Sequence, residues 1–228
     1  GDTITLAQSD VGTTITVTAS YTDTFGASES VTSAATAIID NGNDLPTGSV
    51  TITGTPTEDQ VLTASDNLAD ADGMGTVTYT WSNGATGDTM TLAQSDVGTT
   101  ITVTASYTDG YGAEESVTSA ATSAVANVND SPGGAVTIAG TAVEDGTLTV
   151  SNSITDEDGM GAVTYTWSNG ATGDTMTLAQ SDVGTTITVT ASYTDGYGAE
   201  ESVTSAATSA VANVNDSPGG AVTIAGTA

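Results

Sequence analysis

The chain of 228 residues has no lysine, arginine or histidine, but it has 28 aspartates and glutamates, so its formal charge is −28. No cationic side chain can therefore neutralise an acidic one. A compact state with such a charge repels itself unless cations bind to it or the charges are widely spread. Nucleic acids and anionic membranes are recognised through lysine and arginine. We therefore expect no nucleic-acid partner and no membrane insertion of this segment.

The same absences remove most catalytic chemistry. Without histidine, cysteine or lysine there is no Ser-His or Cys-His pair, no Schiff base, and no nitrogen or sulfur ligand for zinc. A carboxylate pair could still hydrolyse glycosides, but such enzymes usually line their clefts with aromatic residues, which make up only 4% here. We therefore expect no enzyme. The lack of cysteine also excludes disulfides, which leaves packing and metal ions to stabilise the fold.

The sequence repeats with a period of 86 residues. The segment Leu-Ala-Gln-Ser-Asp-Val-Gly begins at Leu6, Leu92 and Leu178, and residues 77–142 are identical to 163–228. An Asn-Asp pair shortly before a proline recurs with the same period and serves as the repeat boundary. We expect half a repeat over 1–42, full repeats over 43–128 and 129–214, the first strand of another over 215–228, and an array that continues beyond both ends.

Within a repeat, threonine alternates with apolar residues in short runs. The expected strands of the first full repeat cover 49–55, 61–65, 76–82, 89–92, 100–108 and 115–125, with a single turn over 93–99. No stretch has the 3.6-residue periodicity of a helix. Six or seven strands in about 86 residues predict an all-β fold, a Greek-key immunoglobulin-like β-sandwich with Trp81 in its core, repeated in an elongated array. Such a unit buries only about 60–65% of its unfolded surface, so its core is thin.

Two carboxylates one residue apart precede the strand that carries Trp81. Asp70 and Asp72 are followed by Gly73, and Asp156 and Asp158 repeat the arrangement. Calcium takes six to eight oxygen ligands, and extracellular modules bind it with dissociation constants of about 10⁻⁴–10⁻³ M. This spacing lets two carboxylates converge on one ion. The alternative is that they are ordinary turn residues, since aspartate and glycine are common in turns.

Several motifs resemble those of cadherins. Residues 68–81 resemble the loop Ala-x-Asp-x-Asp-x-Gly and its strand, residues 105–112 resemble the turn Ala-x-Asp-x-Gly, and residues 127–132 are similar to the linker Asp-x-Asn-Asp-Asn-x-Pro. Glu58 lies near the usual glutamate between the first two strands. More closely, each repeat is similar from end to end to the cadherin-like or Ig-like tandem repeats of giant secreted bacterial adhesins of the RTX type.

The resemblance implies calcium ions between consecutive repeats. The linker of each junction would share ions with the acidic loops of the repeat that follows, and the preceding repeat would close the junction with its own acids. The implied ligands are Asn41, Asn43, Asp44, Asp70, Asp72 and Asp109 at one junction, and Asn127, Asn129, Asp130, Asp156, Asp158 and Asp195 at the next, with Glu58, Asp59, Glu144 and Asp145 closing the junctions.

The chain departs from the cadherin pattern in two places. Asn41 and Asn127 stand where the linker usually begins with aspartate, and the Asp-Arg-Glu segment is replaced by Gln94-Ser95-Asp96. Fewer carboxylates suggest fewer ions or weaker binding. Seven other acids have expected structural roles: turn caps for Asp10, Asp96 and Asp182, and solvated strand-edge charges that discourage edge-to-edge pairing for Glu114, Glu115, Glu200 and Glu201.

These patterns predict a structural function. We expect extender repeats of a secreted bacterial surface adhesin, stiffened by calcium and located outside the cell, with the neighbouring repeats of the same chain as partners. The alternative is a building block that associates laterally with identical chains in an extracellular filament, sheath or surface layer. A ligand-binding module is a third option, for which only Tyr111 and Tyr197 at loop tips are candidates.

Overall fold

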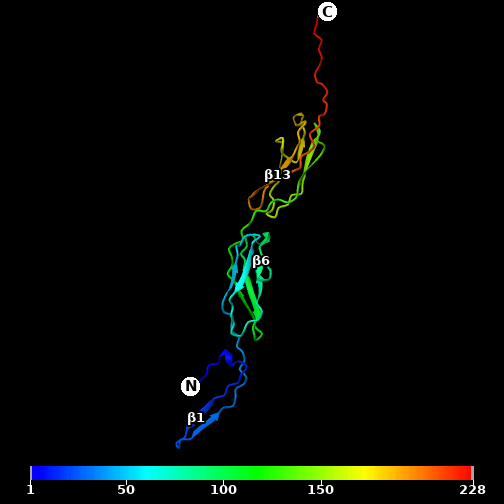
Figure 1. The fold of residues 1–228 in the computed structure, drawn as a ribbon. Coiled ribbons are helices and arrows are strands. Elements are labelled where there is room, and N and C mark those ends of the chain that lie inside the picture. The colour runs from blue at the N-terminus through cyan, green and yellow to red at the C-terminus, as the bar shows by residue number, and fades with distance from the viewer. Residues whose placement is uncertain (1, 227–228) are drawn as a thin grey trace. The chain divides into compact units, whose positions relative to one another are not determined.

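Each full repeat folds into two antiparallel sheets of three strands in this computed structural model, which describes residues 2–226 (Figure 1). Unit 1 ends at Asn127 and unit 2 begins at Val128. The chain changes sheet after the second, third and fourth strands of a repeat, as a Greek-key sandwich requires. The first sheet of unit 1 has the order β3-β4-β6 and the second β5-β7-β8, with β3 (Val50–Thr53), β4 (Val61–Asp66), β5 (Thr78–Trp81), β6 (Thr89–Thr91), β7 (Val103–Thr108) and β8 (Glu114–Thr118).

Unit 2 repeats this topology strand for strand. Its sheets have the orders β12-β10-β9 and β11-β13-β14. The predicted all-β class and sandwich topology are therefore confirmed for both full repeats. The strands are β9 (Val136–Ala139), β10 (Thr147–Asn152), β11 (Thr164–Trp167), β12 (Thr175–Thr177), β13 (Val189–Thr194) and β14 (Glu200–Thr204).

The first 42 residues carry only the second half of a repeat. β1 (Thr18–Thr22) and β2 (Ser28–Thr32) form a hairpin whose residues are all exposed. The equivalent hairpin of the first full repeat is β7-β8, whose inner face is covered by the sheet β3-β4-β6. Residues 2–226 also contain three short 3₁₀ helices: η1 (Gln8–Asp10), η2 (Gln94–Asp96) and η3 (Gln180–Asp182). Among the described residues, no helix has the length and apolar character needed to cross a membrane.

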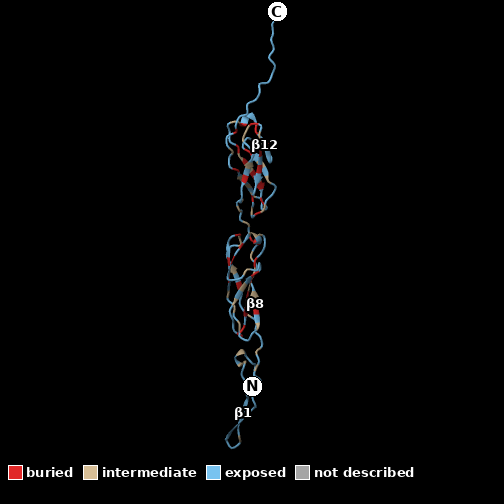
Figure 2. Cartoon of the chain, turned by 90° about the vertical axis from the view of Figure 1, so that its right-hand side faces the viewer, coloured by how far each residue is buried: buried red, intermediate tan, exposed pale blue. Residues whose placement is uncertain are grey.

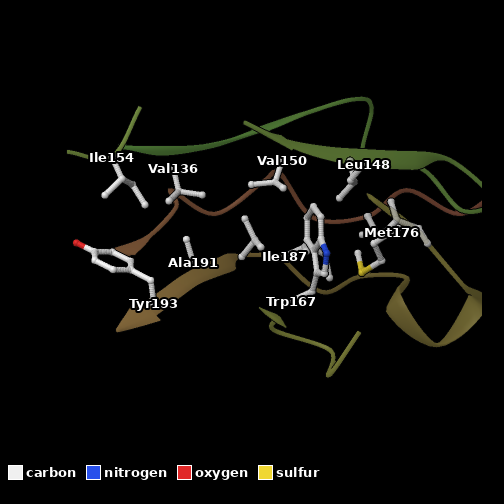
Figure 3. Close-up of a cluster of buried hydrophobic side chains, with 12 residues drawn as sticks. Val136, Leu148, Val150, Ile154, Trp167, Met176, Ile187, Ala191 and Tyr193 are labelled. Carbon is white, nitrogen blue, oxygen red and sulfur yellow. The ribbon is translucent and has the colours of Figure 1, made fainter. Parts of the chain in front are cut away.

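The core of each unit is one row of inward side chains between its sheets. In unit 2, Trp167 is 1% exposed beside Leu148 and Met176, and Tyr193 lies at one end of the row with its hydroxyl directed away from the other core side chains (Figure 3). Figure 2 shows buried segments inside both units. The Trp167 indole donates a hydrogen bond to the Gly173 carbonyl oxygen at 2.9 Å, so the core tryptophan also holds the turn that follows it.

The 3₁₀ turns are held by the aspartates predicted to cap them. One carboxylate oxygen of Asp96 accepts from the Ala93 N–H at 3.0 Å, and the other accepts from the Asn83 side chain at 3.0 Å. Asp182 makes the same two bonds in unit 2. Both carboxylates are 5% exposed, so each aspartate joins two turns inside the protein.

The last segment of unit 1 crosses to the first. Val125 forms a parallel bridge with Val97, and Ala126 forms one with Thr57. The Glu58 N–H donates to the Ala126 carbonyl oxygen at 2.9 Å. These bonds bring the linker beginning at Asn127 to the same end of unit 1 as Glu58.

Candidate metal centre

The two acidic loops of unit 1 lie against each other. One follows β4 and contains Asp70 and Asp72; the other follows β7 and contains Asp109 and Gly110. The Gly110 N–H donates to the Asp72 carbonyl oxygen at 3.1 Å. A Cβ atom on Gly110 would lie 2.4 Å from that oxygen, which is closer than a carbon and an oxygen that are not bonded can approach. Glycine at this position is therefore what allows the two loops to pack together.

The Asn-Asp linker joins this pair of loops. The backbone N–H of Asp44 donates to Oδ2 of Asp72 at 2.7 Å. Asp72 is 5% exposed, and its Oδ1 has no hydrogen-bond partner within the described residues. The structure thus brings the start of the repeat to a carboxylate that has one oxygen held and the other buried without a donor.

Asp109 presents the same situation from the neighbouring loop. Its Oδ1 accepts two backbone bonds, from Tyr111 at 2.9 Å and from Ala113 at 2.7 Å. These bonds close the tight turn between β7 and β8. Asp109 is 7% exposed, and its Oδ2 has no partner in the described part of the chain. Leaving a buried polar group unsatisfied costs about 1–3 kcal/mol, and more when the group is charged.

Asp70 is the anchor of the cluster. Its Oδ1 accepts from the Asp72 N–H at 2.8 Å, and its Oδ2 accepts from the Tyr107 hydroxyl at 2.6 Å. Burial of the Tyr107 ring, helped by the bond to Asp70, raises the pKa of this tyrosine above its ordinary value. Tyr107 is 3% exposed and belongs to β7. A core side chain therefore orients a carboxylate of the acidic loop.

Glu115 belongs to this cluster, and the expectation of a solvated edge charge is wrong for it. It is 8% exposed and accepts from the Asn43 side-chain amide at 2.7 Å. Its counterpart Glu201 makes the same bond to Asn129 and is half-buried. The reason is strand register: Glu115 pairs with Tyr107, two residues from Val117, which packs against the core. Alternation along β8 thus turns Glu115 to the inner side at the sandwich end.

Unit 2 contains the same cluster. The Asp130 N–H donates to Oδ2 of Asp158 at 2.8 Å, and Tyr193 donates to Asp156. Oδ1 of Asp158 and Oδ2 of Asp195 are again buried without a partner in the described residues. The unsatisfied oxygens therefore occur in both units, at matching positions of the 86-residue period.

The cluster of unit 2 also borders a hollow of about 510 Å³ lined by Asp130, Asp156 and Glu157, with Ser131, Gly133 and Thr155. Carboxylate oxygens of Asp130 and Glu157 lie within 4.8 Å of one another. Two carboxylates of unit 2 are thus close enough to be ligands of one cation.

The predicted closing acids divide into two kinds. Glu58 and Glu144 are buried at 2% and 4% exposure, and Glu144 accepts from the Val214 N–H at 3.0 Å, beside the linker that leaves unit 2. Asp59 and Asp145 are instead exposed turn residues with positive φ angles of 62° and 64°. The structure therefore places the glutamates, and not the adjacent aspartates, inside the end of the repeat.

The leading linker asparagines are held by the 3₁₀ turn of their own repeat. Oδ1 of Asn41 accepts from Gln8 at 2.9 Å, and Oδ1 of Asn127 accepts from Gln94 at 3.3 Å. Oε1 of Gln94 is buried without a partner among the described residues. Gln94 thus contacts the linker through its side-chain amide and has a carbonyl oxygen that makes no hydrogen bond within the described residues.

The donor set favours a hard cation. Every candidate ligand is a carboxylate, an amide oxygen or a backbone carbonyl, which are the ligands that calcium and magnesium take. The chain supplies no cationic side chain that could neutralise the buried oxygens. The irregular loops suit calcium, because magnesium requires near-ideal octahedral geometry. Calcium therefore fits the residues present.

No protein-family model and no curated protein matches the chain. A solved structure described as the crystal structure of a tetra-tandem repeat in the extending region of a large adhesion protein is similar to it, with 20% identity and a TM-score of 0.28. The match covers 87% of this chain and 57% of that one, so the chain spans little more than half of that structure. A TM-score this low gives the likeness no weight in an argument about function.

Proposed function

We propose that this chain is a calcium-stabilised extender segment of a secreted surface adhesin and has no catalytic role. The observation that carries the proposal is a pair of buried carboxylate oxygens in the acidic loops of each unit that have no hydrogen-bond partner among the described residues: Asp72 and Asp109 in unit 1, Asp158 and Asp195 in unit 2. If a cation binds where the linker enters the repeat, the conformation of the linker there depends on the ion.

Calcium would stabilise the repeat mainly because it binds the folded state and not the unfolded chain. If free calcium exceeds the dissociation constant about a hundredfold, binding contributes roughly 2.7 kcal/mol to the free energy of unfolding per site. A small domain has only about 5–15 kcal/mol in total. The bound ion would also join the linker to both acidic loops, so bending at the linker would require a ligand to be released.

An extender function is also consistent with the near-identity of the repeats. Residues 77–142 and 163–228 share one sequence, as expected where each copy adds length and none needs a distinct binding surface. The uniformly negative surface would oppose non-specific association.

Small-angle X-ray scattering of the full chain tests the stiffening. We expect the maximum dimension to fall and its distribution to broaden after chelation with EGTA, and to recover with calcium but less with magnesium. The matched control is the double variant D109N/D195N, which should show the broad distribution in either condition. An unchanged distribution after chelation contradicts a calcium-stiffened extender. Calcium-dependent growth in particle mass favours the lateral assembly of identical chains instead.

A further inference from the structure

The acidic clusters of the two units differ at one position. The loop of unit 1 reads Asp70-Ala71-Asp72, and that of unit 2 reads Asp156-Glu157-Asp158. One contact is the same in both units: the linker N–H donates to the second aspartate at 2.7 Å in unit 1 and at 2.8 Å in unit 2. The acidic loop of unit 2 therefore carries one more carboxylate than that of unit 1, between its two aspartates.

Glu157 extends the cluster toward the linker. A carboxylate oxygen of Glu157 lies within 4.8 Å of one of Asp130, and both residues border the hollow that Asp156 also lines. Like charges at this distance repel each other, and no lysine, arginine or histidine exists in the chain to offset them. A divalent cation would turn this repulsion into shared ligation.

A second observation points to a ligand at the same place. Asp158 is 4% exposed, and its Oδ2 is held by the Asp130 N–H, so its carboxylate lies beside the linker residue that approaches Glu157. Its Oδ1 is buried and has no hydrogen-bond partner within residues 2–226. A buried anionic oxygen in a carboxylate that the Asp130 backbone holds is an arrangement that a cation would satisfy.

We propose that Glu157 is an additional calcium ligand in unit 2, so that this unit binds calcium more tightly than unit 1. The inference rests on the proposed function, since it assumes that the shared cluster binds calcium. Ligand charge count is one of the properties that tune calcium affinity. A chain with unequal sites would become ordered in steps as calcium rises, with unit 2 before unit 1.

Isothermal titration of the full chain with calcium, after treatment with EGTA and dialysis, tests this directly. We expect two classes of site that differ about tenfold in dissociation constant. Glu157→Gln should remove the tighter class by weakening it about tenfold, and Ala71→Glu should strengthen the weaker class. Asp174→Asn is the matched control, because it removes one exposed charge of unit 2 outside the cluster and should leave both classes unchanged.

The outcomes distinguish a failure of the Glu157 proposal from a failure of the proposed calcium binding itself. If the wild-type chain binds calcium but Glu157→Gln titrates like the wild type, Glu157 is only a solvated loop charge and the inference is wrong. If Asp174→Asn weakens binding as much as Glu157→Gln, net charge explains the effect and the inference is again wrong. If the wild-type chain takes up no calcium at all, the proposed function itself fails.

Discussion

Replacing Asp109 and Asp195 together by asparagine should have opposite effects on stability with and without calcium. Asparagine keeps the Oδ1 acceptor that receives the Tyr111 and Ala113 N–H groups in unit 1. It replaces the buried, unpartnered Oδ2 by a neutral amide group. The change therefore preserves the turn and removes only the charge that a cation would need.

The magnitude follows from the burial of this oxygen. Without calcium, the wild-type chain leaves a charged oxygen unsatisfied in a residue that is 7% exposed, at a cost of about 1–3 kcal/mol or more. The variant should thus be more stable than the wild type by about 1–3 kcal/mol per unit in EGTA. With calcium about a hundredfold above its dissociation constant, the wild type gains roughly 2.7 kcal/mol per site. The variant loses most of that gain and becomes the less stable protein.

Urea unfolding followed by tryptophan fluorescence measures both conditions, since Trp81 and Trp167 report on one unit each. Asp88→Asn with Asp174→Asn is the matched control, because it removes two exposed charges outside the clusters. It should shift stability equally in EGTA and in calcium. If D109N/D195N destabilises the chain by the same amount in both conditions, the buried oxygens are not cation ligands and the reasoning is refuted.

Three further results are expected. Replacing Tyr107 and Tyr193 by phenylalanine should weaken calcium binding about tenfold, because outer-shell partners orient metal ligands, with calorimetric titration as the measure and an unchanged affinity as the contrary result. The hydrogen bond to Asp66, with burial, raises the pKa of Tyr79 to about 12. Its neutral form is thus favoured in the folded state, so its contribution to stability should be complete below pH 10 and decline as the pH rises through 12, as alkaline unfolding monitored by circular dichroism would show. Trp81→Ala should cost unit 1 about 3–5 kcal/mol and leave the unfolding of unit 2 unchanged, as the fluorescence of Trp167 would report.

Much of the fold was predictable because it follows from local alternation. Leu62 and Ala64 face inward as expected, and Trp81 is 1% exposed in the core. The single turn after Leu92 is the 3₁₀ helix η2. These features depend on a period of two and on turn residues, both of which can be recognised in a short segment.

The composition of the site was harder to predict, because it depends on which segments meet. Asp72 and Asp109 could be proposed from their motifs, but their unpartnered oxygens follow from how the backbone of Asp44 and the tight turn after β7 occupy the other oxygen. Glu115 was missed although a signal was available. Its distance of two residues from inward-facing Val117 places it on the inner face, but a charged residue near a turn suggested solvent.

Calorimetric unfolding of the full chain with and without excess calcium tests the central claim most directly. We expect calcium to raise the unfolding temperature of the wild type by several degrees, since 1 kcal/mol corresponds to about 4–8 °C for a domain of this size, and EGTA to reverse the shift. The D109N/D195N variant should lose most of this response. Identical unfolding temperatures for the wild type in calcium and in EGTA would contradict the claim that these acidic clusters are calcium sites.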